Sequence, residues 1–195
     1  RHCWLIAGDI AKEERCKELI KDTVAAFGGI GILVNNAGLH FENKSLEKIS
    51  TREMLKTFET NVFSMFWVTK ACLPYMKKGS CIINTASVTA YRGSSSLMDY
   101  AATKGAIVSF TRSLSSNLIK KGIRVNGVAP GPVWTPLIAS SFNSKRVAQH
   151  GSNAPMERSG QPVEIAPCYL FLASADSGYI SGQFLHPNGG EIVNG

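Results

Sequence analysis

Ile32-Leu33-Val34-Asn35-Asn36-Ala37-Gly38 is the stretch of sequence that decides the fold. Its first three residues form a short apolar run, which predicts a buried strand. The Asn-Asn-Ala-Gly tetrad follows without a break and is rich in turn-forming residues. Strands that are apolar on both faces are typical of parallel sheets with helices on either side. We therefore look for helices and further strands on both sides of this stretch.

The N-terminal side begins with another apolar run. Trp4-Leu5-Ile6-Ala7-Gly8 predicts a buried strand that ends at Asp9-Ile10. Between Cys16 and Phe27, apolar residues recur at helical spacing, and Gly28 supplies a stop signal. A strand and a helix are thus expected before residue 32.

The C-terminal side continues the alternation. The predicted helices start after the capping box Ser50-x-x-Glu53, near Tyr100 and at Pro162, and the predicted strands cover residues 81–84, 123–128 and 182–185. The first of these helices is expected to bend near Asn61. Alternating strands and helices predict the α/β class, a Rossmann-like doubly wound parallel sheet in a single domain, residues 1–195. Residues 133–160 lack periodicity and are expected to form a mobile substrate lid with short helices.

Composition excludes several classes of protein. With 195 residues and 44% hydrophobic content, the chain can bury one sizeable core. Its five scattered cysteines include no C-x-x-C pair, which favours reduced thiols and a cytoplasmic location. The four histidines show no ligand spacing, so no metal site is predicted. No uncharged stretch is suited to span a membrane.

The net charge of +7 is unevenly distributed. Residues 61–156 contain eleven Lys or Arg and one acid, Asp99. A nucleic-acid surface would call for a dense basic run or a stripe interleaved with aromatic residues, and neither is present. We therefore expect no nucleic-acid partner, and a solvated surface whose field attracts an anionic cofactor or substrate.

Asp99-Tyr100-Ala101-Ala102-Thr103-Lys104 carries the predicted chemistry. A tyrosine and a lysine four residues apart share one helical face, about one turn apart. A free tyrosine titrates near pH ~10. A neighbouring ammonium favours the phenolate, so we expect Lys104, together with a cofactor cation, to lower the pKa of Tyr100 and make it a general acid/base.

Other polar residues occupy the positions where such sheets bind ligands, beyond the carboxyl ends of the strands. They are Asp9, the Asn35–Gly38 turn, Ser87 and Pro130-Gly131, with Asn61 on an intervening helix. In this order, and with thirteen residues from Ser87 to Tyr100, they resemble the short-chain dehydrogenase/reductase family. Residues 85–91, 130–137 and 151–156 are similar to its glucose/ribitol dehydrogenase or aldehyde reductase branch.

The resemblance implies an NAD(P)-dependent oxidoreductase that interconverts an alcohol and a carbonyl (a polyol, sugar or aldehyde) by hydride transfer. Tyr100 would exchange a proton with the substrate oxygen, and Ser87 would hydrogen-bond that oxygen. Lys104 would bind the nicotinamide ribose, and Asn61 would hold a water in a proton relay. The implied cofactor-binding residues are Asp9, Ile10, Asn36, Ala37, Gly38, Tyr100, Lys104, Pro130, Gly131, Val133 and Thr135.

The same resemblance implies NAD or NADP as cofactor, a small-molecule alcohol or carbonyl as substrate, no membrane partner, and a homodimer or homotetramer. One expected part is not found, the strand and Gly-rich turn that hold the cofactor pyrophosphate. The chain would begin at the family's third strand, with the first two strands and helices absent. The strand at 4–8 would then be separated from that at 32–34 by a hole, or would shift into it or pair with another chain.

For that reason residues 1–195 alone are not expected to be a competent dehydrogenase. Two alternatives stay open beside the oxidoreductase. One is an epimerase or dehydratase that uses the same Tyr-Lys pair. The other is a non-catalytic, truncated binding or regulatory module, which cofactor titration would separate from the enzymes.

Overall fold

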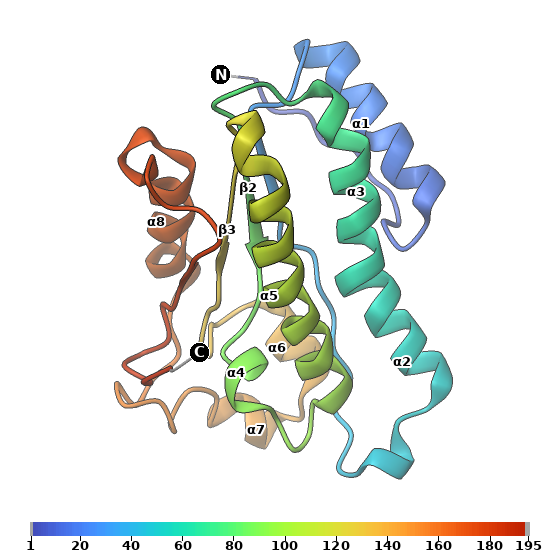
Figure 1. Ribbon diagram of the computed structural model, residues 1–195. Helices are drawn as coiled ribbons and strands as arrows, with labels where there is room; N and C mark the ends of the chain where they lie inside the picture. Colours follow the sequence, from blue (N-terminus) through green and yellow to red (C-terminus); the bar gives the residue numbers. More distant parts are fainter. Residues whose placement is uncertain (1, 194–195) are drawn as a thin grey trace.

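A parallel sheet of four strands lies at the centre of the computed structural model, which describes residues 2–193 (Figure 1). In order across the sheet, the strands are β1 (Ile32–Asn35), β2 (Cys81–Thr85), β3 (Arg124–Val128) and β4 (Phe184–Leu185). The register pairs Leu33 with Ile82 and Ile82 with Val125, so one buried apolar row crosses three strands. The predicted α/β class and parallel sheet are confirmed.

Helices cover both faces of the sheet. They are α1 (Glu13–Phe27), α2 (Thr51–Phe58), α3 (Ser64–Cys72), α4 (Thr89–Arg92), α5 (Met98–Leu118), α6 (Pro136–Ser141), α7 (Ser144–Ala148) and α8 (Pro162–Ala173). Helices α3 and α5 lie on one face, α8 lies on the other, and α1 packs on α3 (Figure 1). Because side chains alternate along a strand, Ile82 joins the α3 and α5 side while Ile83 packs with Leu172 of α8.

Between α2 and α3 the helix widens into a π-helical segment, Glu59–Phe63. The capping box predicted at Ser50 and Glu53 is present at the start of α2. The π-helical turn falls on Asn61, where a bend was expected, and such turns occur frequently at functional sites. The sequence after Ser50 therefore forms one long helical rod whose irregular turn carries a candidate site residue.

The prediction of a strand at residues 4–8 is wrong. Residues 2–9 form no regular secondary structure and pair with no strand of the described chain. Trp4 instead packs edge-on against Phe27 of α1, with 6.4 Å between ring centroids, and the guanidinium of Arg15 donates to the Ala7 carbonyl. An apolar run becomes a strand only where a neighbour satisfies its backbone groups, and this segment lies against a helix.

The expected hole in the sheet is also absent from the described residues. The four strands are contiguous, and β1 forms one edge. Helix α8 packs on β2 and β3, so Ile32 and Val34 on that side of β1 stay about half exposed, at 52% and 44%. The final strand, β4, is shorter than predicted, and residues 133–160 contain the short helices α6 and α7. No helix in the part of the chain described here is long and apolar enough to cross a membrane.

Candidate active site

A cavity of about 1270 Å³ opens where β1, β2 and β3 end. Its wall includes Gly38 after β1, Ser87 after β2 and Gly131 after β3, as expected for the carboxyl edge of a parallel sheet. Tyr100 and Lys104 of α5 complete it. This volume is larger than the few hundred to about 1,000 Å³ typical of small-molecule pockets, which leaves room for a dinucleotide beside a substrate.

Lys104 is buried, with 3% of its surface exposed, in spite of its charge. Its Nζ donates a 2.8 Å hydrogen bond to the carbonyl oxygen of Thr85 and lies 5.3 Å from the centroid of the Tyr100 ring. Burial lowers the pKa of Lys104 to about 8. The predicted pairing of Tyr100 and Lys104 on one face of a helix is therefore present.

The pKa of Tyr100 is shifted in the direction opposite to the one expected. Burial raises its pKa to about 12, while the Ser87 hydroxyl acts in the opposite direction. The lowering expected from Lys104 and a cofactor cation does not arise from Lys104 alone, because removal of the phenol from water sets the direction of the shift. At neutral pH Tyr100 is consequently protonated, which is the form that a proton donor needs.

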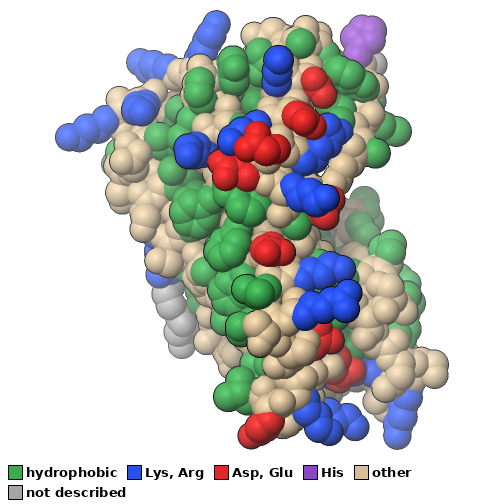
Figure 2. Space-filling view, turned by 90° about the vertical axis from the view of Figure 1, so that its right-hand side faces the viewer, with side chains coloured by type: hydrophobic (Ala, Val, Ile, Leu, Met, Phe, Trp, Pro, Cys, Tyr) green, Lys and Arg blue, Asp and Glu red, His purple; other side chains and the backbone are tan. Residues whose placement is uncertain are grey.

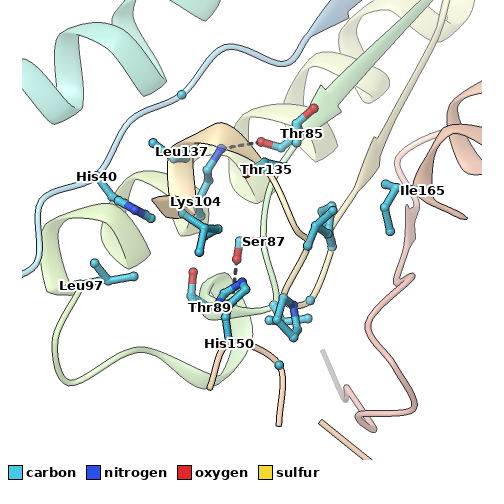
Figure 3. A pocket seen from close by; sticks show the side chains of 18 of the residues that line it. His40, Thr85, Ser87, Thr89, Leu97, Lys104, Thr135, Leu137, His150 and Ile165 are labelled. Carbon is cyan, nitrogen blue, oxygen red and sulfur yellow. Dashed lines mark hydrogen bonds between the residues drawn. The ribbon is translucent and has the colours of Figure 1, made fainter. Parts of the chain in front are cut away.

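The loop after β2 holds Ser87 in place. Its Oγ accepts a hydrogen bond from the backbone N–H of Thr89 at 3.2 Å (Figure 3), and its O–H faces the Tyr100 hydroxyl, whose pKa it lowers. The flanking amides of Ala86 and Val88 donate to the carbonyls of Val128 and Pro130. The serine is thus fixed between the ends of two strands and faces the cavity.

Asn61 clamps the loop that follows Gly38. Its Oδ1 accepts from the backbone N–H of Leu39 at 2.8 Å, and its Nδ2 donates to the Leu39 carbonyl at 2.9 Å and to Thr103 Oγ1 at 3.1 Å. Both N–H groups of the side-chain amide are therefore used within the protein. A water relay would need some other atom of Asn61 than these donors.

Gly38 lies between two candidate residues. A Cβ atom at this position would stand 3.5 Å from both Lys104 Nζ and Asn61 Oδ1. The loop at Gly38 therefore passes within van der Waals reach of both groups. Asn36, Ala37, Pro130, Gly131, Val133 and Thr135 also line the cavity.

Asp9 and Ile10 are not brought to this cavity. The Asp9 carboxylate is exposed and accepts from the backbone N–H of Ala11 at 3.0 Å. Ile10 lines a second cavity of about 340 Å³ beside β1, which also borders Asn36 and Asn61. Both residues follow the segment wrongly predicted as a strand, so the sheet does not place them at its carboxyl edge.

His40, Phe142, Arg146 and His150 line the cavity and were missed by sequence reasoning. The His40 ring is T-shaped against Tyr100, at 5.3 Å between centroids, and lies 5.1 Å from Phe142. Burial is the main cause that lowers the pKa of His40 to about 4. His40 precedes the other three by about a hundred positions and meets them only because the fold brings residues 133–160 against the loop after β1, which no local pattern reveals.

The donors present fit a nicotinamide dinucleotide. An ammonium has three N–H groups, and the described residues give Lys104 one acceptor, so two N–H groups remain for ribose hydroxyls. Cofactor and substrate would share the cavity, with Gly38 beside Lys104. Among the residues that the structure describes, no group of His, Cys, Asp and Glu could hold a metal ion.

Comparison with known sequences gives consistent matches. A family described as enoyl-(acyl carrier protein) reductase matches residues 1–191. The chain is 59% identical to the uncharacterized oxidoreductase YhxC of Bacillus subtilis over 193 residues, which cover 99% of this chain and 68% of that protein. It is 56% identical to glucose and ribitol dehydrogenase of Daucus carota, over 97% of this chain and 65% of that protein. The NADPH-dependent aldehyde reductase 1, chloroplastic, of Arabidopsis thaliana is 53% identical, over 97% of this chain and 66% of that protein.

Solved structures agree with these sequence matches. The ligand-free aldohexose dehydrogenase of Thermoplasma acidophilum superimposes with a TM-score of 0.87 at 29% identity, over 95% of this chain and 76% of that one. A glucose/ribitol dehydrogenase from Brucella melitensis superimposes with a TM-score of 0.87 at 35% identity, over 95% of this chain and 74% of that one. The chain thus spans about two thirds of the length of the curated relatives and about three quarters of these structures.

Proposed function

Because this chain belongs to the short-chain dehydrogenase/reductase family, we propose that it interconverts an alcohol and a carbonyl with NAD or NADP, using Tyr100 as acid/base. The observation that carries this proposal is the meeting of Ser87, Tyr100 and Lys104 in one cavity at the carboxyl edge of the sheet. The relatives named for glucose and ribitol, and for aldehyde reduction, support a polyol, sugar or aldehyde as substrate.

In the direction of reduction, the neutral phenol of Tyr100 donates its proton to the substrate oxygen. The Ser87 O–H donates a hydrogen bond to the same oxygen and stabilises the negative charge that develops there. The bound cofactor supplies the hydride. Lys104 uses its two remaining N–H groups to hold the ribose and thereby orients the cofactor beside Tyr100.

The cofactor-binding set that we propose is narrower than the one expected from sequence. It comprises Asn36, Ala37, Gly38, Tyr100, Lys104, Pro130, Gly131, Val133 and Thr135. Asp9 and Ile10 are left out because they lie away from the main cavity. Asn61 is a positioning residue, since it fixes Leu39 and with it the turn at Gly38.

Residues 133–160 are proposed to act as the substrate lid. They contribute Phe142, Arg146 and His150 to the cavity wall. Their contacts with His40 and Glu42 are made by side chains, through ring packing and an ion pair. Such a cover excludes water from the reacting atoms when it is closed.

The five free thiols support the proposed cytoplasmic location.

A homodimer or homotetramer is proposed from the surface of α2, α3 and α5. Figure 2 shows hydrophobic side chains gathered on the face that carries α2 and α3. Leu55, Phe63 and Phe66 are each more than 40% exposed there. The Phe66 ring packs against Phe110 of α5, with 4.1 Å between ring centroids and 39° between the ring planes. Exposed apolar patches of this kind mark association surfaces.

Activity and binding assays on purified protein that contains this chain test the proposed function. We expect formation of reduced nicotinamide with ribitol or glucose and its consumption with an aldehyde, followed by absorbance. Calorimetric titration with NAD and NADP separates the alternatives. Cofactor binding without any turnover would support a binding module, and conversion of the substrate without net oxidation would support an epimerase or dehydratase.

A further inference from the structure

Two arginines line the part of the cavity that is not assigned to the cofactor. They are Arg92 at the end of α4 and Arg146 in α7. A guanidinium with free N–H groups in such a place is the usual protein partner for a carboxylate or phosphate. Whether these two groups are free therefore decides the charge of the substrate that this cavity accepts.

Arg146 is held by three neighbours. Its NH1 forms an ion pair with the Glu42 carboxylate, which comes from the loop after β1. Its NH2 donates to Ser96 Oγ at 3.0 Å, and its guanidinium lies over the Phe142 ring, 4.3 Å from the centroid. The Glu42 and Arg146 side chains are 23% and 38% exposed, so water only partly screens the pair. The positive charge of Arg146 is thus compensated before any ligand arrives.

Arg92 is compensated in the same way. Its Nε lies 3.3 Å from Oε1 of Glu191, which comes from the C-terminal segment and also lines the cavity. The Arg92 side chain is 55% exposed, so this pair is weaker than the first. Each arginine therefore meets a carboxylate from a distant part of the chain.

The rest of this wall offers neutral hydrogen-bonding groups. The polar side chains that line it are His40, Ser94, Gln149, His150, Ser152 and Asn153. Burial lowers the pKa of His40 to about 4 and lowers that of His150, so both rings are neutral near pH 7. Nε2 of each ring is buried without a partner among the described residues. Hydroxyls, which both donate and accept, match such groups.

We propose that this half of the cavity selects an uncharged, polyhydroxylated substrate over its phosphate ester, and that Glu42 sets the selectivity by holding Arg146. The inference rests on the proposed function and narrows its substrate class. A phosphate here meets guanidinium groups whose charge is already compensated, that of Arg146 by Glu42 and that of Arg92 by Glu191, and the Glu191 carboxylate itself lines the cavity. It would lose hydration without an uncompensated partner, which is costly.

The test compares ribitol with ribitol 5-phosphate, for both kcat/KM with the preferred cofactor and binding by calorimetry. For the unaltered protein we expect kcat/KM at least ~10-fold higher for ribitol. Glu42→Gln keeps the shape of the side chain but releases the charge of Arg146. It should improve relative use and binding of the phosphate ester about 10-fold, because a charge-assisted hydrogen bond becomes available.

The double variant Glu42→Gln with Arg146→Gln is the matched control. It should lose the gain, since the guanidinium responsible is gone. A preference of the unaltered protein for the ester, no effect of Glu42→Gln, or a gain that survives in the double variant would each overturn the inference. If no compound is turned over, the proposed function fails, while ester binding to the single and double variants still decides the role of Glu42.

Discussion

Tyr100 and Lys104 both titrate away from their ordinary values, and burial is the main cause in each case. Burial disfavours the charged form of any group, so it raises the pKa of a phenol and lowers that of an amine. The spacing of the two residues was visible in sequence. Their depth in the protein was not, because it depends on packing between α5, the loop after β2 and residues 133–160.

Tyr100→Phe removes only the hydroxyl and should leave the fold intact. We expect turnover to fall at least ~10²-fold, the usual contribution of a general acid. Steady-state kinetics measures this, and circular dichroism shows whether the variant is folded. Tyr75→Phe is the matched control, because Tyr75 is 42% exposed and does not line the cavity. Retained activity in Tyr100→Phe would remove this residue from the mechanism.

Lys104 should make cofactor binding depend on pH. Its ammonium predominates below pH about 8 and the neutral amine above it, so the dissociation constant for NAD or NADP should rise as pH increases through that value. Lys104→Met should bind weakly and without this dependence. Calorimetric titration at several pH values checks both. An unchanged affinity in Lys104→Met would contradict the proposed contact with ribose.

The same shift has a consequence for stability. The folded protein binds the Lys104 proton less tightly than the unfolded chain does, between a pKa of about 8 and the ordinary 10.5. The unfolded state therefore holds more protons in this window, and the contribution of Lys104 to the free energy of unfolding rises with pH there. Below pH about 8 the full cost of the buried charge is present.

At the scale of elements, the π-helical turn between α2 and α3 ties two parts of the site together. It presents Asn61, which binds both backbone groups of Leu39 and the Thr103 hydroxyl of α5. Asn61→Ala should lower the free energy of unfolding by about 2–4 kcal/mol, since it leaves buried polar groups unpaired. Urea unfolding measures the loss.

Ser50→Ala provides the comparison for Asn61→Ala. It removes the capping box of the same helical rod at an exposed position and should cost about 1 kcal/mol. A loss for Asn61→Ala no larger than that for Ser50→Ala would show that the clamp on Leu39 is dispensable.

Elements defined by local pattern were predictable, and those defined by a partner were not. The apolar runs at β1, β2 and β3 form strands because each of them has a neighbouring strand with which its backbone groups pair. The equally apolar run at residues 4–8 did not, because it lies against α1. For the same reason Asp9 lies outside the cavity, while Ser87, which follows β2, lines it.

On the scale of the whole molecule, the long-range contacts of the lid carry information that sequence spacing lacks. The ion pair between Glu42 and Arg146 joins the loop after β1 to α7 across about a hundred residues. His40 packs on Phe142 over a similar separation. Both contacts depend on the sheet first bringing the strand ends together, so they are consequences of the fold and not of any motif.

Self-association is the expectation that belongs to this scale. Phe66 of α3 is 48% exposed and its ring packs against Phe110 of α5, which gives two neighbouring helices a shared apolar face. Phe66→Asp should shift a dimer or tetramer toward monomer, because a carboxylate at the centre of an interface is costly to bury. Leu46→Asp is the control, since Leu46 is 68% exposed but lies outside α2, α3 and α5. Light scattering at micromolar concentration measures the mass of each protein. An unaltered protein that is a well-folded monomer, or equal dissociation by both variants, would show that this face is not the interface.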